Sequence, residues 1–255
     1  MTLACEPTPA GRSWSMGKPI RATVFDAYGT LYDVQSVLDR VERACPGRGA
    51  LVTQIWRLKQ LEYTWLRTAM DAFADFAVVT RDSLIYALDA AGLDATDAIV
   101  ADLTEAYLHL TPASDAQACL QALAGKITAV FSNGTGAMLD ALVQNSGLGS
   151  LLTHVISVDA ARAFKPSPRA YALVEARTGV PPDETLFVSG NGFDVAGAKQ
   201  FGFQVTWVRR GGGPAPATAT ADVGQLFQAL RLRAERLDVQ PDRVVRSLLE
   251  ITHDR

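Results

Sequence analysis

Five short apolar segments, each ending on small or polar residues, constrain the fold of this chain more than any other feature. They are rich in β-branched and aromatic residues, and most of the stretches between them have helical periodicity. Near-continuous apolar strands that alternate with helices are typical of a parallel sheet with helices on both faces. The five segments are VFDAYGTLYD (24–33), KITAVFSN (126–133), HVISVDA (154–160), TLFVSGN (185–191) and FQVTWVRR (203–210). The sequence therefore predicts an α/β fold with a Rossmann-like core.

Helical segments are predicted between the later strands, and a longer helical block follows the first strand. The short helices are TGAMLDALVQNSG (135–147), SPRAYALVEARTG (167–179) and FDVAGAKQFGF (193–203). The interval 34–111 has no strand pattern, and two of its stretches, 54–77 and 80–92, are amphipathic. An apolar stripe on the first of them is formed by Trp56, Leu61, Trp65 and Leu66.

The long helical interval is most simply an inserted cap domain. Ligands in open α/β sheets bind outside the carboxyl ends of the strands, so a cap there would cover the ligand and exclude water. The predicted division is a flexible N-terminal extension (1–18), a core (19–33 and 112–255) and a helical cap (34–111). A loop and a further helix, near 223–237, are expected after the last strand.

The composition argues against several classes of partner. With 255 residues and a formal net charge of −3, the chain has no electrostatic reason to bind nucleic acid or an anionic membrane. Cys5, Cys45 and Cys119 form no metal-binding cluster, and they are expected to be reduced thiols in a cytoplasmic protein. No apolar run approaches the roughly 20 residues that span a bilayer. We expect no secretory signal, because residues 1–19 lack a basic start followed by an apolar stretch. Met16 is an alternative start. We expect no cofactor, no metal ion, no nucleic acid and no membrane partner.

Polar side chains follow the predicted strands, and parallel strands bring them to one rim of the sheet. They are Asp26, Tyr28 and Thr30; Ser132 and Asn133; Lys165 and Tyr171; and Ser189, Asn191, Phe193 and Asp194. An aspartate at a strand end is more often a cap or turn residue, so Asp26 becomes a candidate only because the others accompany it. Asp194 has the alternative of capping the following helix.

The order of these motifs resembles that of the haloacid dehalogenase superfamily. The four superfamily motifs correspond to DAYGT (26–30), FSN (131–133), FKP (164–166) and SGNGFDVAGA (189–198). Longer stretches resemble the L-2-haloacid dehalogenases in particular: DAYGTLYDVQSV (26–37), PGRG (46–49), WRLKQLEYTWLR (56–67) and FVSGNGFDVAGAKQFGF (187–203). The resemblance implies a Rossmann-like core with a helical cap, a homodimer, and hydrolysis of short 2-haloacids, with the L enantiomer preferred.

Two positions depart from the phosphatases of that superfamily. The acid that protonates a leaving alkoxide is replaced by Tyr28, and an acid that holds Mg²⁺ is replaced by Gly190. A phenol with a pKa of about 10 is a poor proton donor near neutrality, and phosphoryl transfer without charge neutralisation is disfavoured. A halide leaves as a stable anion and needs neither group. We therefore expect Asp26 to displace a halide from carbon and to form an aspartyl ester, which water then hydrolyses.

The resemblance and the chemistry together assign a role to each candidate residue. The catalytic set is Asp26, Lys165, Asp194, Arg57, Thr30, Ser189 and Asn191, with Tyr171 in support. The substrate carboxylate is expected to bind Ala27, Tyr28, Ser132 and Lys165, and the halide Arg57, Asn133 and Phe193. The predicted alkyl pocket is Tyr28, Leu58, Leu61, Phe76 and Phe193. A lone arginine on an amphipathic helix usually faces water, so Arg57 has the least support from the sequence.

Two other functions stay open at this point. One is a metal-dependent phosphatase of the same superfamily, against which Tyr28 and Gly190 argue. The other is a catalytically silent protein that uses the fold to bind a ligand, which would tolerate loss of Asp26 or Lys165. Neither residue is lost.

Overall fold

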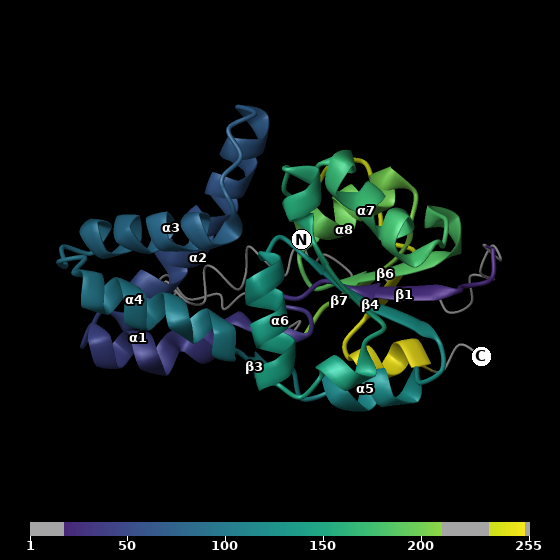
Figure 1. Ribbon diagram of the computed structural model, residues 1–255, viewed down its shortest axis with the longest axis horizontal. Coiled ribbons are helices and arrows are strands. Elements are labelled where there is room, and N and C mark those ends of the chain that lie inside the picture. The colour runs from purple at the N-terminus through teal and green to yellow at the C-terminus, as the bar shows by residue number, and fades with distance from the viewer. Residues whose placement is uncertain (1–17, 211–234, 253–255) are drawn as a thin grey trace, which may run out of the picture.

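A six-stranded sheet, parallel throughout, forms the centre of the core in the computed structural model (Figure 1), which describes residues 18–210 and 235–252. The strand order is β5-β4-β1-β6-β7-β8. The strands are β1 (Ala22–Phe25), β4 (Ile127–Ser132), β5 (His154–Ser157), β6 (Thr185–Ser189), β7 (Gln204–Val208) and β8 (Arg243–Val245). All four residues of β1 are buried, as a strand covered by helices on both faces requires. The predicted α/β fold is confirmed.

The core helices lie on both faces of the sheet, with α7 and α8 above it and α5 below it in Figure 1. They are α5 (Ala116–Ala122), α6 (Gly136–Asn145), α7 (Pro168–Thr178) and α8 (Gly192–Phe201). α7 ends at Gly179, whose φ of 68° is the left-handed conformation that favours glycine at a helix C-terminus. Short 3₁₀ helices join the elements: η3 (Gly149–Leu151), η4 (Val158–Ala161), η5 (Pro182–Glu184) and η6 (Leu248–Thr252).

The position of β1 explains where a site forms. β1 pairs with β4 on one side and with β6 on the other, so the two halves of the chain diverge around it. A crevice opens at such a switch point, outside the carboxyl ends of the strands. Asp26 is the residue that directly follows β1.

A helical insertion lies beside the sheet, on the left in Figure 1. It comprises η1 (Val34–Val37), α1 (Leu38–Ala44), α2 (Gly49–Ala69), α3 (Phe76–Ala90), α4 (Asp97–Glu105) and η2 (Ala106–His109). β2 (Tyr32–Asp33) and β3 (Thr111–Pro112) pair antiparallel and so bring the two ends of the insertion together. This ribbon lies at the predicted boundary of the cap. The division into two domains stays a prediction, and α1 to α4 are called the cap helices below.

Two sequence-based predictions about the cap are wrong in detail. The stretch 54–77 is not one helix, because α2 ends at Ala69 and α3 starts at Phe76, capped by Asp75 Oδ1, which accepts from Val78 N at 2.9 Å. The apolar stripe is also incomplete. Trp56 and Leu61 are buried, but Trp65 and Leu66 are exposed by 40% and 45%.

Other differences concern segments with weak patterns or outside the described residues. α1, α4, α5 and β8 were not predicted individually, since each is nine residues long or shorter. The N-terminal extension, Cys5, and most of the loop and helix expected after residue 210 lie outside the described residues.

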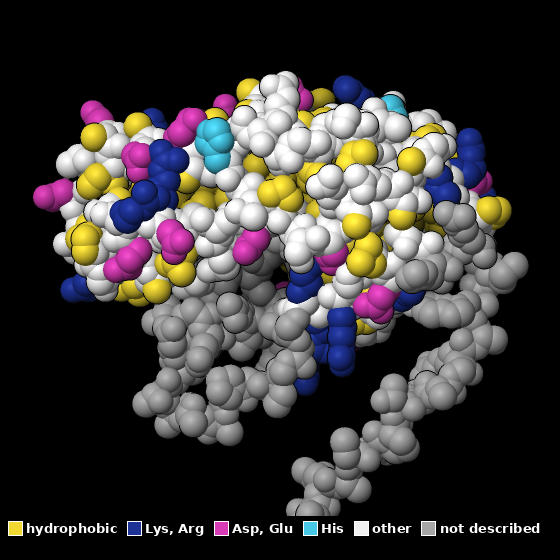
Figure 2. Space-filling view, turned by 90° about the horizontal axis from the view of Figure 1, so that it is seen from below, with side chains coloured by type: hydrophobic (Ala, Val, Ile, Leu, Met, Phe, Trp, Pro, Cys, Tyr) yellow, Lys and Arg dark blue, Asp and Glu magenta, His cyan; other side chains and the backbone are white. Residues whose placement is uncertain are grey.

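Neither sign of charge dominates the face of the molecule drawn in Figure 2. On the face seen in Figure 2, basic and acidic side chains are interspersed with apolar ones. Within 18–210 and 235–252, no helix combines the length and the apolar character needed to cross a membrane.

Candidate active site

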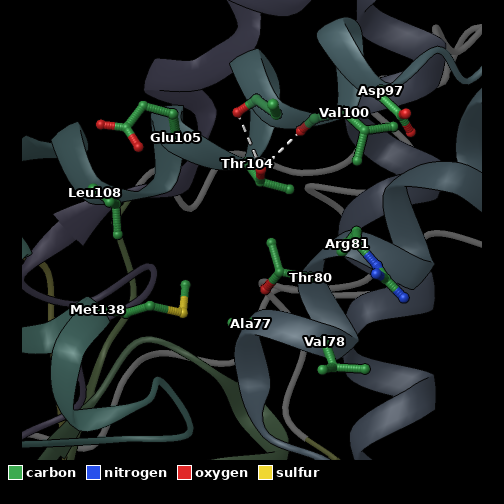
Figure 3. A pocket seen from close by; sticks show the side chains of 11 residues that line it. Ala77, Val78, Thr80, Arg81, Asp97, Val100, Thr104, Glu105, Leu108 and Met138 are labelled. Carbon is green, nitrogen blue, oxygen red and sulfur yellow. Dashed lines mark hydrogen bonds between the residues drawn. The ribbon is translucent and has the colours of Figure 1, made fainter.

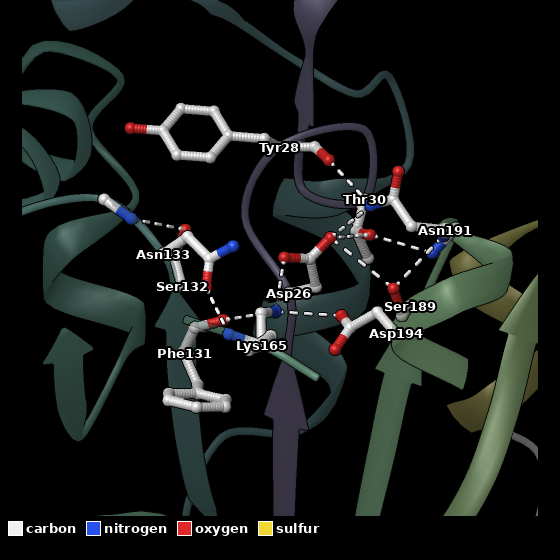
Figure 4. A network of polar contacts seen from close by, with 12 residues as sticks. Asp26, Tyr28, Thr30, Phe131, Ser132, Asn133, Lys165, Ser189, Asn191 and Asp194 are labelled. Carbon is white, nitrogen blue, oxygen red and sulfur yellow. Dashed lines mark hydrogen bonds and ion pairs between the residues drawn. The ribbon is translucent and has the colours of Figure 1, made fainter. Parts of the chain in front are cut away.

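Asp26 lies at the carboxyl end of β1, 4% exposed, and its carboxylate is held by four groups (Figure 4). Oδ2 accepts from Thr30 Oγ1 at 2.9 Å and from Asn191 Nδ2 at 2.7 Å, with Ser189 Oγ at 3.5 Å. Oδ1 accepts from Lys165 Nζ at 2.8 Å. These groups come from three segments at the same edge of the sheet: the turn after β1, the end of β6 with the turn that follows it, and the loop before α7. They fix the carboxylate in one orientation. Among the described residues only Lys165 donates to Oδ1, which leaves a lone pair of this oxygen for the cavity.

Lys165 joins two carboxylates that are far apart in the sequence. Its Nζ is 2.8 Å from Asp26 Oδ1 and 2.8 Å from Asp194 Oδ2, and it also donates to Phe131 O at 3.3 Å. Burial alone would lower the pKa of this ammonium, but Asp194 and Asp26 together raise it above its ordinary value. The group therefore stays charged in a site where Lys165 is 1% exposed.

Asp194 is fully buried behind Lys165. Its Oδ1 accepts from Tyr171 Oη at 2.8 Å, so its carboxylate is used within the core and does not cap α8. Burial raises the pKa of Asp194, and the nearby Asp26 adds to this, against the opposing effect of Lys165. Burial also raises the pKa of the Tyr171 phenol well above its ordinary value, as does the adjacent Asp194, so Tyr171 remains a donor.

A small cavity lies between this network and the cap helices. The core contributes Asp26, Tyr28, Ser132, Asn133, Lys165, Asn191 and Phe193 to its walls, and the cap contributes Arg57, Leu61 and Phe76. The Tyr28 ring stacks on Phe76 with ring centroids 5.4 Å apart. The cavity therefore has one polar end, at Asp26 and Lys165, and an apolar wall.

The structure brings most predicted site residues to this cavity or directly behind it. Thr30, Ser189, Asp194 and Tyr171 lie behind the walls and support Asp26 or Lys165, and Ala27 is buried in the turn after Asp26. The prediction that Leu58 lines the alkyl pocket is wrong. This residue is 45% exposed and does not line the cavity, because it lies one residue, about 100° around the helix, from Arg57.

Arg57 is buried, contrary to the usual position of an arginine on an amphipathic helix. It is 4% exposed, and its Nη1 donates to Gln60 Oε1 at 2.5 Å. Gln60 was not predicted as a site residue. Its place three residues after Arg57 on a helix was the available signal, because residues at i and i+3 are neighbours.

Two further contacts were also missed. Asn133 Oδ1 accepts from Lys165 N at 2.9 Å, which leaves the Asn133 amide group to donate into the cavity. Trp65 packs edge-on against Phe193 with ring centroids 5.3 Å apart, and so joins α2 to the core. Both contacts depend on tertiary packing and have no pattern in the sequence.

A larger, open cavity lies beside α3 and α4, with Met138 of α6 at one side (Figure 3). Its walls carry Thr80, Arg81, Asp97 and Glu105 among apolar residues, and none of the predicted site residues. In the part of the chain that the structure describes, no three potential ligand side chains gather to hold a metal ion.

Comparison with known proteins agrees with the geometry. The family model for haloacid dehalogenase-like hydrolases matches residues 20–202. Over 233 residues the chain is 53% identical to an (S)-2-haloacid dehalogenase of Xanthobacter autotrophicus, covering 90% of this chain and 92% of that protein. Over 197 residues it is 45% identical to haloacetate dehalogenase H-2 of Moraxella sp. (strain B), covering 76% and 88%.

A solved structure is similarly close. It is that of the L-2-haloacid dehalogenase of Xanthobacter autotrophicus with chloropropionic acid covalently bound. It matches with a TM-score of 0.88 and 51% identity over 91% of this chain and 97% of that one.

Proposed function

The chain belongs to the haloacid dehalogenase-like hydrolase family, and we propose that this member is an (S)-2-haloacid dehalogenase. It hydrolyses the carbon–halogen bond of short 2-haloalkanoic acids and haloacetates to give 2-hydroxy acids and halide. Asp26 is the nucleophile, and the 2-haloacid is the small-molecule partner. The relatives that act on (S)-2-haloacids and on haloacetate support this substrate class.

The observation that carries the proposal is a single, buried, fully oriented carboxylate facing a covered cavity. Asp26 is 4% exposed, and Oδ2 is fixed by Thr30 and Asn191 while Oδ1 keeps a lone pair. A carboxylate is a weak nucleophile in water. To displace a halide it needs a site that excludes water and holds it in the correct orientation. No acidic side chain stands two residues later, because that residue is Tyr28.

In the first step Asp26 Oδ1 attacks the carbon that bears the halogen, from the side opposite the halogen. A carbon–oxygen bond forms, the carbon–halogen bond breaks, and the halide leaves with the bonding electron pair. The configuration at carbon inverts. Ser132 and the backbone N–H groups of Ala27 and Tyr28 donate to the substrate carboxylate, and Lys165 attracts it through its positive charge, since its three N–H groups already bind Asp26, Asp194 and Phe131 O. The halide meets the guanidinium of Arg57, the amide of Asn133 and the ring edge of Phe193.

In the second step water attacks the carbonyl carbon of the aspartyl ester. The carbonyl–oxygen bond to the substrate breaks, so the 2-hydroxy acid leaves and the Asp26 carboxylate is restored, with one net proton released. Asp194 accepts the proton of the attacking water or holds Lys165 in place. Its 2.8 Å contact with Lys165 supports the second of these roles.

The site argues against a metal-dependent phosphatase. Asp26 Oδ2 and Tyr28 O are oxygens of the kind that bind Mg²⁺. Asn191 Nδ2 donates to both, at 2.7 Å and 2.9 Å, so an amide stands where a cation would bind. An added Cβ at Gly190 would meet the carbonyl oxygen of Gly29, so no acid fits there without a backbone shift. Burial also raises the pKa of the Tyr28 phenol well above its ordinary value, which makes it a poorer acid.

A catalytically silent binding protein is also disfavoured. Such a protein would have no need to keep Lys165 between two carboxylates or to bury Arg57 over the cavity. We further propose a homodimer and a cytoplasmic location. The exposed apolar residues Leu58, Trp65 and Leu66 of α2 support the first, and the free, buried thiols of Cys45 and Cys119 support the second.

Halide release from the two enantiomers of 2-chloropropionate, without added metal, tests the function. We expect chloride from the (S) enantiomer and little from the (R) enantiomer. Chloroacetate, which has no stereocentre, is the control for access to the site. No chloride from any substrate, together with Mg²⁺-dependent phosphate release from an aryl phosphate, would transfer the assignment to a phosphatase.

A single turnover in ¹⁸O-labelled water tests the covalent step. Because water attacks the ester carbonyl, the first heavy oxygen should enter the Asp26 carboxylate and not the product. Mass spectrometry of the peptide that contains Asp26 detects it. Label found only in the 2-hydroxy acid would mean that water attacks the substrate carbon directly.

A further inference from the structure

The guanidinium of Arg57 is a buried cation in the wall of the cavity. Buried charges in proteins are usually paired, because an isolated one is expensive. Within the described ranges no carboxylate forms an ion pair with Arg57, its Nη1 donates to the neutral Gln60, and its Nε has no partner. The positive charge is therefore left for a group that arrives in the cavity.

The Gln60 side chain is fixed at both ends. Its Oε1 accepts from Arg57 Nη1 at 2.5 Å, and its Nε2 donates to Thr80 Oγ1 at 2.9 Å. Gln60 is 0% exposed, and Thr80, in the wall of the cavity drawn in Figure 3, is 1% exposed. The reverse orientation of the amide would place its NH₂ group against the donors of Arg57, so only this orientation is favourable.

Thr80 is itself anchored. Its carbonyl accepts from Trp56 Nε1 at 2.8 Å and from Ser83 Oγ at 3.1 Å. The chain Arg57–Gln60–Thr80 thus connects the arginine over the cavity to the buried seam between α2 and α3.

We propose that Gln60 is a positioning residue that orients Arg57 with a neutral acceptor and so keeps its full charge for the departing halide. A glutamate has the same shape and would also accept from Arg57. It would pair with the guanidinium, however, and would bring a negative charge close to the leaving anion. This inference rests on the proposed function, since it assumes that Arg57 meets the halide.

The test compares Gln60→Glu, which keeps the acceptor and adds charge, with Gln60→Met, which keeps the length and has neither. Single-turnover halide release from (S)-2-bromopropionate and inhibition by bromide are measured for each. We expect the Glu variant to release halide about 100-fold more slowly, a loss typical of removing one transition-state stabiliser, and to bind bromide more weakly. The Met variant should lose about 10-fold, the value of one hydrogen bond to a charged group.

The relative rates of halide release in the two variants decide the test. Our proposal predicts that the Glu variant is the slower, whereas a merely structural role predicts that the Met variant is the slower. If Gln60 only held the helices together, the Glu variant would act like wild type and the Met variant would be the worse. That order, or wild-type bromide inhibition in the Glu variant, overturns the proposal. Hydrolysis of the preformed ester should change little in either variant, because the halide has already left.

Two controls keep the result interpretable. If the Glu variant does not fold, Thr80→Val replaces it, because it removes the acceptor of the Gln60 amide. We expect this variant to release halide a few-fold more slowly and to hydrolyse the ester at an unchanged rate. An unchanged rate of halide release would overturn the inference. Wild-type protein is assayed in parallel. A wild type that releases no halide refutes the proposed function, whereas an active wild type with an equally active Glu variant refutes only this inference.

Discussion

At the scale of single residues, Asp26 and Asp194 show how one side-chain type acquires two roles. Both accept from Lys165 Nζ at 2.8 Å, so the ammonium alone does not distinguish them. Their other partners do: Asp26 is held by Thr30 and Asn191 at the cavity wall, whereas Asp194 is fully buried and accepts from Tyr171. The group that reaches the substrate is therefore Asp26, and Asp194 acts from behind.

Replacement of Asn191 should have a clear effect on halide release, because its amide binds the nucleophile. Asn191→Asp removes the two hydrogen bonds to Asp26 Oδ2 and Tyr28 O and places a carboxylate against a carboxylate. Like charges this close cannot both ionise easily. We expect halide release to fall at least about 100-fold, the order of loss seen when one transition-state donor is removed.

The same variant should acquire an affinity for divalent cations. Three oxygens would then face one point, and Mg²⁺ or Ca²⁺ should raise its Tm by mass action. Asn191→Leu is the matched control, which loses activity but offers no new ligand. Thermal unfolding with and without the metal measures this change in Tm. If the metal shifts the Tm of Asn191→Asp no more than that of wild type and of Asn191→Leu, the amide does not occupy a cation position.

At the scale of elements, the phase of α2 decides which cap residues face the core. Arg57, Leu61 and Trp65 are spaced by four residues and lie on one face, and the first two line the cavity. Leu58 and Leu66 are one residue away from members of this face, and both are 45% exposed. Leu58 was therefore placed wrongly in the alkyl pocket.

The core residues of the site could be predicted from the sequence more reliably than the cap residues. The positions of Asp26, Ser132 and Ser189 in the site could be predicted, because the carboxyl ends of parallel strands meet at one edge of the sheet whatever the details of packing. Cap residues such as Leu58 and Gln60 depend on how a helix is rotated and docked, which no spacing in the sequence gives. The contact of Trp65 with Phe193 joins α2 to α8 and has the same origin.

The Trp65–Phe193 contact should limit the length of the alkyl group that the site admits. Trp65 lies one turn beyond Leu61 on α2, and Phe193 lines the cavity. Trp65→Ala removes an aromatic pair worth about 0.5–1.5 kcal/mol. We expect kcat/KM for (S)-2-bromohexanoate, relative to (S)-2-bromopropionate, to rise roughly 5-fold, within the range that this energy allows.

Leu66→Ala is the matched control for this prediction. Leu66 is the neighbouring residue on α2 and is 45% exposed. Its removal should leave the ratio of the two substrates unchanged. An equal ratio in wild type and Trp65→Ala would mean that the aromatic contact does not restrict the substrate.

At the scale of the whole molecule, Asp115 connects the C-terminal segment to the turn that carries the nucleophile. Its Oδ1 accepts from Arg210 Nη2 at 2.8 Å, and its Oδ2 accepts from Ser247 Oγ at 2.9 Å and Leu248 N at 2.8 Å. Arg210 Nη1 in turn donates to Thr30 O at 2.8 Å. Thr30 bonds Asp26, so the site is braced by a part of the chain more than 200 residues away in sequence.

This tie should make stability depend on pH. Burial raises the pKa of Asp115, but the Leu248 N–H and Arg210 outweigh it and hold the pKa below its ordinary value. A carboxyl whose pKa is lower in the folded state contributes stability above its unfolded pKa, about 4, and loses it as the pH falls through the folded pKa. Asp115→Asn should therefore cost about 1–3 kcal/mol at pH 7, and this cost should shrink below about pH 4.

Urea unfolding of both proteins at pH 7, 5 and 3.5 measures the difference. Asp183→Asn is the control, because Asp183 pairs with Lys18 at the surface, where its side chain is 53% exposed. An exposed pair contributes little, so this variant should differ from wild type by less than about 1 kcal/mol at each pH. A cost for Asp115→Asn that stays constant from pH 7 to 3.5 would mean that its ionised carboxylate is not what joins the C-terminal segment to the nucleophile turn.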